Sequence, residues 1–123
     1  MAKQAKKTVL IADINLTKYK ELSASDLTKW AKEYLALKKI RLNRVNNIPV
    51  RRRKGTIEKG WADLQGYNSK GIYVAVEVKK IGDRLSEEQI KRLDDVMNCG
   101  AEAYICTQEG KNPKLIAWTE MGL

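Results

Sequence analysis

The sequence predicts a single α/β domain, residues 1–123, built around a mixed β-sheet with flanking helices. Residues 72–78 are apolar at almost every position, which predicts a central strand covered on both faces. The capping-box sequence Ser86-Glu-Glu-Gln89 predicts a helix start. Residues 103–107 then predict another strand, and the order strand, helix, strand favours a right-handed crossover and a parallel strand pair. A chain of 123 residues is the size of one domain.

The first third of the chain predicts a strand, a helix and a second strand. Residues 8–14 form a short run rich in β-branched residues, which predicts a strand at a sheet edge or one that pairs across a dimer. Ser23 and Asp26 have the spacing of a helix start. The apolar stripe that follows has helical spacing and predicts a helix that ends near residues 38–39: Leu27, Trp30, Ala31, Tyr34, Leu35 and Leu37. A strand over residues 40–45 and a loop to residue 60 complete this part.

The second half predicts a β-hairpin from residues 61–67 and 71–79. An odd number of loop residues would place Asp63 directly opposite Glu77, whereas a two-residue turn would place Asp63 on the other face of the sheet. Gly66 and Gly71 are candidate positions for a bulge that corrects the register. The following helix has a buried stripe and ends at Gly100, with Ile90, Leu93, Val96 and Met97 as the stripe. Residues 115–118 predict a short strand or a helix start.

Composition excludes several kinds of chemistry. The chain has no histidine, so histidine-dependent nucleophile systems, histidine-ligated zinc and histidine general bases are impossible. Cys99 and Cys106 fit no metal or redox spacing and are interpreted as reduced, partly buried thiols. We expect a cytoplasmic protein with no membrane partner, because no apolar run is long enough to span a bilayer and the first residues do not resemble a secretory signal.

The positive charge is concentrated in one part of the chain. The formal net charge is +9, but residues 83–123 hold 5 basic and 8 acidic side chains, so the excess lies in residues 1–82. The densest stretch, residues 41–59, contains one acidic residue, Glu58, and seven basic ones: Arg41, Arg44, Arg51, Arg52, Arg53, Lys54 and Lys59. Such a stretch favours nucleic acid as a partner through phosphate contacts. A solvated, solubilising surface is the alternative.

Two carboxylates and a lysine form the candidate chemical site. Glu77 and Lys79 are two residues apart on a strand, so their side chains leave the same face of the sheet. With Asp63 beside Glu77, the pair would suit a hard divalent cation such as Mg²⁺ or Mn²⁺. Lys79 would then orient a water or stabilise negative charge in phosphoryl chemistry. The alternative is a structural ion pair, because Glu-x-Lys alone is common.

Four segments together resemble the VRR-NUC (virus-type replication-repair nuclease) domain of the PD-(D/E)xK nuclease superfamily. They are Gly60-Trp-Ala-Asp63, Tyr73-Val-Ala-Val-Glu77-Val-Lys79, Gly82-Asp-Arg-Leu-Ser-Glu-Glu-Gln89 and Gly100-Ala-Glu-Ala-Tyr104. The resemblance covers residues 22–107 and leaves residues 1–21 as an N-terminal extension to the family core.

This resemblance implies a PD-(D/E)xK nuclease-like core and metal-dependent phosphodiester hydrolysis. It implies Asp63, Glu77 and the Val78 carbonyl as metal ligands, with Lys79 as the catalytic lysine and Gln89 as a further catalytic-site residue. Two positions depart from the family pattern. Ala62 replaces a proline, and Ala24 replaces a helix glutamate, for which Asp26 is the favoured substitute over Glu21 and Glu33.

The resemblance implies a structure-selective DNA endonuclease that uses Mg²⁺, with Mn²⁺ able to substitute. Small stand-alone members resemble Holliday-junction resolvases, are typical of bacteriophages and so would act in the bacterial host's cytoplasm. A homodimer is expected, because two symmetric cuts require two sites related by a two-fold axis. The alternatives are a flap, nick or single-strand nuclease, and a non-catalytic basic DNA-binding module. Trp61, beside Asp63, is the tryptophan to test for DNA contact.

The charge distribution generates a first prediction, in which Arg44 and the four basic residues of positions 51–54 contact DNA phosphates. We expect affinity for DNA to fall steeply between low and moderate salt concentrations, because each phosphate contact releases bound counterions. Titration of labelled DNA at several salt concentrations measures this dependence. A flat salt response would count against Arg51, Arg52, Arg53 and Lys54 as phosphate contacts.

Overall fold

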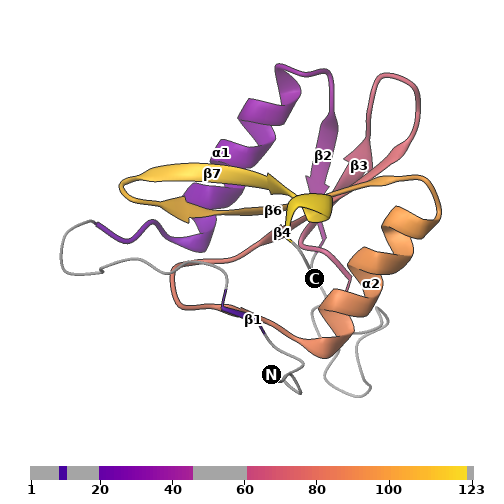
Figure 1. Cartoon of the computed structure of the whole chain (residues 1–123). Helices are drawn as coiled ribbons and strands as arrows, with labels where there is room; N and C mark the ends of the chain where they lie inside the picture. The colour runs from indigo at the N-terminus through magenta and orange to yellow at the C-terminus, as the bar shows by residue number, and fades with distance from the viewer. Residues whose placement is uncertain (1–8, 11–19, 46–60, 122–123) are drawn as a thin grey trace, which may run out of the picture.

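The protein folds as a five-stranded mixed sheet with one long helix on each face (Figure 1). The computed structural model describes residues 9–10, 20–45 and 61–121. In the sheet, the strand order is β2-β3-β4-β6-β7, and the β4–β6 pair is parallel while the other pairs are antiparallel. The elements of this sheet and its helices are α1 (Ala24–Ala36), β2 (Arg41–Arg44), β3 (Leu64–Tyr67), β4 (Tyr73–Val78), α2 (Glu87–Asn98), β6 (Glu102–Glu109) and β7 (Asn112–Ala117). The predicted α/β class is confirmed.

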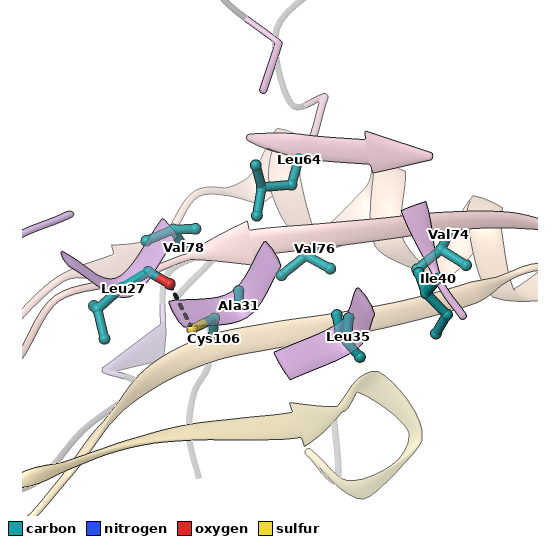
Figure 2. Close-up of a cluster of buried hydrophobic side chains, with 9 residues drawn as sticks. All are labelled: Leu27, Ala31, Leu35, Ile40, Leu64, Val74, Val76, Val78 and Cys106. Atoms are coloured by element: carbon teal, nitrogen blue, oxygen red, sulfur yellow. Dashed lines mark hydrogen bonds between the residues drawn. The ribbon is translucent and has the colours of Figure 1, made fainter. Parts of the chain in front are cut away.

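Strand β4 is the centre of the molecule, and its two faces bury different cores. Val74, Val76 and Val78 face α1, where they pack with apolar side chains of that helix and with Leu64 (Figure 2). Ala75 faces the second core, which α2 completes with Leu93 and Val96. Every residue from 74 to 78 is buried. The near-continuous apolar sequence of this strand follows from burial on both faces.

Both long helices begin with the capping boxes that the sequence predicts. In α1 the Ser23 side chain accepts from the Asp26 N–H and the Asp26 carboxylate accepts from the Ser23 N–H. In α2 the pair is Ser86 and Gln89. Each box satisfies two N–H groups that the first helical turn would otherwise leave without partners. The α2 helix also ends as predicted, before Gly100 with a φ of 85°.

The end of α1 differs from the prediction. The helix ends at Ala36 rather than near residues 38–39, and the chain then turns through Lys39, which has a φ of 65°. Leu37 therefore falls beyond the helix and is 83% exposed, although its spacing placed it in the buried stripe. The sequence contains no glycine or proline here to mark the helix end.

The β3–β4 hairpin closes through the three residues Ser69, Lys70 and Gly71. The Asn68 N–H donates to the Ile72 carbonyl at 2.9 Å, and Gly71 takes a φ of 78°. The Asn68 side chain stabilises the loop, because its Oδ1 accepts from the N–H groups of Lys70 and Ile72. Strand β3 begins at Leu64, three residues later than the predicted strand. The odd-numbered loop sets Leu64 opposite Val76 without a bulge at Gly66.

Three short elements complete the described chain: β1, β5 and a 3₁₀ turn. Val9–Leu10 (β1) pairs with Arg84–Leu85 (β5) in a separate two-stranded sheet, so this part of residues 8–14 pairs within the chain. Strands β6 and β7 form a hairpin, and each is longer than the predicted segments of residues 103–107 and 115–118, since β7 includes Pro113 at an outer strand of the sheet. A 3₁₀ turn, Trp118–Glu120, follows it. Residues 115–118 thus end a strand and begin a helical turn.

Gln108 is a buried polar residue that fixes the start of α1, and the sequence analysis did not identify it. Its side chain is 1% exposed and lies on β6. The Leu22 N–H donates to its Oε1 at 2.7 Å, while its Nε2 donates to the Lys20 carbonyl at 2.7 Å and to the Gly110 carbonyl at 2.9 Å. The segment before α1 is therefore attached to β6 by hydrogen bonds rather than by apolar contacts alone.

The two cysteines are both free, with Cys99 exposed and Cys106 buried. The Cys106 thiol lies 3.6 Å from the Leu27 carbonyl, and burial raises its pKa to about 12 (Figure 2). Neither helix in the described residues is long and apolar enough to cross a membrane.

Gly66 generates a prediction about the sheet, because β2 approaches it too closely for a side chain. A Cβ atom at this position would overlap the Arg41 carbonyl of β2. We expect Gly66→Ala to lower the free energy of unfolding by about 3 kcal/mol, the upper part of the usual range for overpacking. Urea denaturation measures the change.

The matched control is Gly71→Ala, where a Cβ would meet open space and only the positive φ is unfavourable. Its cost should be about 1 kcal/mol, the scale of a non-glycine residue in the left-handed region. Equal effects of the two substitutions would contradict the close approach of β2 to β3.

Candidate active site

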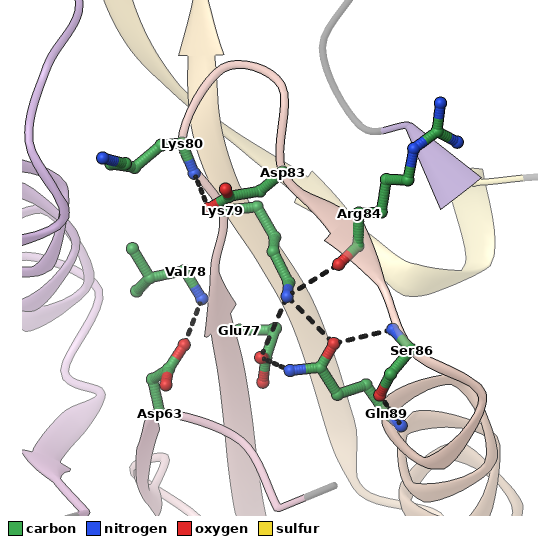
Figure 3. A network of polar contacts seen from close by, with 9 residues as sticks. All are labelled: Asp63, Glu77, Val78, Lys79, Lys80, Asp83, Arg84, Ser86 and Gln89. Carbon is green, nitrogen blue, oxygen red and sulfur yellow. Dashed lines mark hydrogen bonds and ion pairs between the residues drawn. The ribbon is translucent and has the colours of Figure 1, made fainter. Parts of the chain in front are cut away.

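Asp63 and Glu77 lie side by side where β3 begins and β4 ends (Figure 3). The hairpin register pairs Leu64 with Val76, so one step further along the ladder Asp63 is opposite Glu77. The Asp63 Oδ2 accepts a hydrogen bond from the Val78 N–H at 2.9 Å, which holds the half-buried carboxylate against β4. The odd-loop alternative considered in the sequence analysis is therefore the one observed.

Glu77 is a buried carboxylate with one oxygen unsatisfied by the described residues. Its side chain is 2% exposed. Its Oε2 accepts from the Gln89 Nε2 at 2.5 Å, whereas its Oε1 is buried without a hydrogen-bond partner in the described part of the chain. Burial, followed by the nearby negative charge of Asp63, raises the pKa of Glu77 to about 8, although Lys79 acts in the opposite direction.

Lys79 is held in a fixed position over the same face of β4. It is 9% exposed, and its Nζ donates to the Arg84 carbonyl at 3.0 Å and to the Gln89 Oε1 at 2.9 Å. The same nitrogen lies 3.8 Å from the Glu77 Oε2. Three acceptors from three parts of the chain therefore surround one ammonium group (Figure 3).

Gln89 connects the start of α2 to both charged residues. Its Oε1 accepts from the Ser86 N–H at 2.9 Å and from Lys79, while its Nε2 donates to Glu77. Since donors meet the oxygen and an acceptor meets the nitrogen, the contacts fix the orientation of the amide. Gln89, the partner of the N-cap residue Ser86 in the capping box of α2, is thus also the residue that orients Glu77 and Lys79.

The donor set suits a divalent cation of the Mg²⁺ type. Two carboxylates lie together, and one of them has a buried oxygen without a partner. The Lys79 N–H donates to the Cys106 carbonyl of β6, so the backbone groups of the preceding Val78 point to the other side of β4, toward Asp63. The Val78 carbonyl therefore points to the β3 side of β4, where Asp63 lies. Oxygen donors of these kinds, completed by water, are those that Mg²⁺ accepts.

The structure does not bring Asp26 into this cluster. The Asp26 carboxylate is exposed and caps α1. Within the described ranges, no group of three or more Asp, Glu, Cys or His residues is arranged to hold a metal ion. The site consequently contains two carboxylates, and Asp26 as a substitute for the helix glutamate stays a prediction.

The predicted DNA-contact residues fall partly inside the described chain. Arg44 is exposed at the end of β2, and the neighbouring Val45 N–H donates to the Asp63 carbonyl at 2.8 Å. Arg44 therefore lies on the strand next to Asp63, but it pairs with Leu64, so its side chain leaves the α1 face of the sheet, opposite the carboxylate pair. Arg51, Arg52, Arg53 and Lys54 lie outside the described residues.

Two contributors to the site were not assigned to it from the sequence. The Arg84 main-chain carbonyl holds Lys79, and the Ser86 N–H holds the Gln89 oxygen. A backbone carbonyl leaves no mark in a sequence, so nothing there points to Arg84. Ser86 did carry a signal, since the capping box predicts a contact with Gln89.

A mixed sheet with an aspartate at one strand end and Glu-x-Lys on the next strand is the arrangement of PD-(D/E)xK nucleases. The family model described as the VRR-NUC domain matches residues 5–109, and the chain belongs to this family. The match extends to residue 5, ahead of residue 22, at which the resemblance of the sequence motifs begins. No curated protein matches the chain. The protein is therefore a nuclease of the PD-(D/E)xK type.

Glu77 generates a prediction about stability and pH in the absence of metal. Because its pKa in the folded protein, about 8, is above the ordinary value of 4.5, the folded state binds this proton more tightly than the unfolded state. The stabilisation that this proton gives to the folded state is complete at pH values below 4.5 and is lost as the pH rises through about 8. We expect Glu77→Gln to remove this decline and to be more stable than the wild type at about pH 8. Urea denaturation of the wild type and the variant, in the presence of a chelator and at about pH 5 and 8, measures the decline and the difference in stability.

Glu109→Gln is the control, because Glu109 is exposed and its ion pair with Lys114 lies at the surface. This variant should keep the pH dependence of the wild type. A Glu77→Gln protein that loses stability with rising pH as strongly as the wild type would contradict the assignment.

Proposed function

We propose that this VRR-NUC domain is a Mg²⁺-dependent, structure-selective DNA endonuclease that resolves Holliday junctions as a homodimer. The observation that carries the proposal is the cluster of Asp63, Glu77 and Lys79, at the ends of two neighbouring strands, with Gln89 from the start of α2. The side chains of Lys79 and Gln89 meet Glu77, and Asp63 lies beside it (Figure 3). A carboxylate pair with a buried lysine beside it is suited to phosphodiester hydrolysis.

Asp63, Glu77 and the Val78 carbonyl would hold the cation, which is Mg²⁺ with Mn²⁺ as a substitute. When bound, the cation supplies Lewis-acid polarisation of a phosphoryl oxygen and a lower pKa for a bound water. Hydrogen bonds from Val78 and Gln89 hold the two carboxylates in place before substrate arrives. Little reorganisation of these side chains is then needed during the reaction.

Lys79 acts as the fixed positive charge of the site. Its ammonium group is shielded from solvent and held by the Arg84 carbonyl and Gln89, so its direction toward the carboxylate pair is set. In this position it can donate a hydrogen bond to the attacking water or to a phosphate oxygen as negative charge develops. A buried cation is effective in this role because water does not screen it.

Junction resolution by a dimer is supported by size and charge. The 14.0 kDa chain carries one such cluster in its described residues, whereas symmetric cutting of two strands needs two. The net charge of +9 favours a polyanionic substrate with several phosphate contacts, for which Arg44 and residues 51–54 are the candidates. The alternatives are cleavage of flaps, nicks or single strands, and DNA binding without cleavage.

A cleavage assay on labelled four-way junctions, flaps and linear duplex, with and without Mg²⁺, tests the proposal. We expect paired, symmetric cuts in the junction that require the cation. Lys79→Ala and Asp63→Asn should each lower the cleavage rate by at least about 100-fold, the scale of losing one positioned catalytic group. Both variants should still bind the junction.

Each alternative gives a different result in the same assay. Binding without metal-dependent cutting would contradict the nuclease. Cutting of flaps but not of junctions would contradict the resolvase, and a wild-type protein that sediments as a monomer on the junction would contradict the homodimer.

A further inference from the structure

A groove on the same face of the sheet as the candidate active site is used by none of the chemistry above. It has a volume of about 700 Å³ and lies between Trp61, the start of β4 and the C-terminal half of α2. The side chains that define its character are Trp61, Ile72, Tyr73, Arg92, Asp95 and Val96. Trp61 and Ile72 are 37% and 38% exposed, and large apolar side chains exposed together on one groove are typical of a binding surface.

The groove and the active site share their three structural elements. Trp61 precedes Asp63 by two residues. Tyr73 lies on the same face of β4 as Glu77, because the two are four residues apart in one strand. Arg92 follows Gln89 by three residues, so both occupy one face of α2. At about 3.3 Å per residue, Tyr73 and Glu77 are about 13 Å apart along β4. A ligand in the groove would therefore lie on the same face of the sheet as the carboxylate pair, at the opposite end of β4, and would be held by the same rigid elements.

Trp61 and Arg92 are in contact with each other and line one surface of the groove. The Arg92 guanidinium lies 4.5 Å from the centre of the Trp61 ring. An indole and a guanidinium are the two flat groups on which nucleobases stack in proteins that bind single-stranded nucleic acid. The indole remains partly exposed while it contacts Arg92.

Tyr73 and Asp95 add hydrogen-bonding groups to this surface. The Tyr73 hydroxyl is buried and has no hydrogen-bond partner among the described residues. An unsatisfied buried hydroxyl is costly, and a ligand that offers it a partner would remove that cost. Asp95 can accept a hydrogen bond from a donor on the ligand.

The charge of α2 indicates which part of a nucleotide fits the groove. The helix carries Glu87, Glu88, Asp94 and Asp95 against Lys91 and Arg92. This excess of negative charge is unfavourable for a phosphate group but not for a neutral aromatic ring with polar edges. The groove therefore suits the base of a nucleotide whose phosphate lies elsewhere.

We infer that the groove binds one unpaired nucleobase of the DNA substrate, stacked on Trp61 with its polar edge toward Tyr73 and Asp95. The inference rests on the proposed function, from which the DNA substrate comes. Binding of an unpaired base would give the protein a physical basis for selecting branched DNA. Bases can leave the stack at a branch point at low cost, whereas those of intact duplex cannot. Recognition of a displaced base on the same face of the sheet as the carboxylates would thus favour branched substrates over linear duplex.

A double-mutant cycle tests this inference, with one change in the protein and the other, an abasic residue, in the DNA. It requires only measurements of binding affinity. Fluorescence anisotropy in the presence of a chelator measures affinity for four-way junctions and flaps that carry an abasic residue at each position near the branch. We expect one position at which the abasic residue weakens wild-type binding by about 5-fold or more, the scale of one lost stacking contact. Trp61→Ala should bind DNA that has all its bases more weakly than the wild type does, by a similar factor. An abasic residue at that position should not weaken the binding of this variant any further.

Two variants control for altered folding and for general loss of an aromatic residue. Trp61→Phe keeps a stacking ring and should retain most of the abasic effect, while melting temperatures verify that each variant is folded. Tyr67→Ala removes an aromatic side chain that is 53% exposed and does not line this groove, so the full abasic effect should remain.

The result that would overturn the inference is an abasic effect of the same size in the wild type and in Trp61→Ala at every position. The absence of an abasic effect in the wild type would also overturn it. Neither result depends on cleavage. A wild type that shows the coupled loss but does not cut DNA with Mg²⁺ would support the groove and contradict the nuclease assignment.

Discussion

The alignment of β3 with β4 is the constraint on which the rest of the site depends. A three-residue loop, stabilised by the Asn68 side chain, sets a register in which Asp63 meets Glu77. A shift by one residue would turn Asp63 toward the α1 core and bring Leu64 to the face of Glu77. The apolar packing of Leu64 against α1 opposes that shift, so the same core that stabilises the sheet also fixes the pair of carboxylates.

The candidate active site also depends on charged side chains that are buried inside a well-packed fold. Glu77 and Lys79 are buried on the α2 face of β4, and their hydrogen bonds come mainly from a single neutral side chain, that of Gln89. The arrangement leaves one Glu77 oxygen without a partner among the described residues and raises the pKa of that carboxyl group. A site of this kind is less stable than an apolar core of the same volume, and a bound cation would offset the difference.

Much of this structure could be predicted because local signals agreed with the global fold. The capping residues Ser23 and Ser86 marked both helix starts, and the apolar run of β4 identified the central strand. The Asp63–Glu77 pairing could be predicted only as one of two alternatives, because one residue more or less in the loop moves the Asp63 side chain to the other face of the sheet.

Other parts left no local signal. Pro113 and the polar residues around it hide the first half of β7, which forms because β6 provides a partner strand. Leu37 fits a helical stripe but lies after the helix end, and Gln108 resembles any polar residue until the segment before α1 is placed beside it. The orientation of Lys79 depends on the Arg84 carbonyl, which is invisible in sequence. In each case the missing information concerns contacts between distant parts of the chain.

The double role of Gln89 has a consequence for local motion. The first turn of a helix is where opening fluctuations have the lowest free energy. If that turn of α2 opens, the Gln89 amide leaves Glu77 and Lys79 at the same moment as it leaves the Ser86 N–H. The reactive arrangement would then be lost while β4 and its neighbours stay folded. Amide hydrogen exchange at the start of α2 therefore reports how long the site persists in its assembled form.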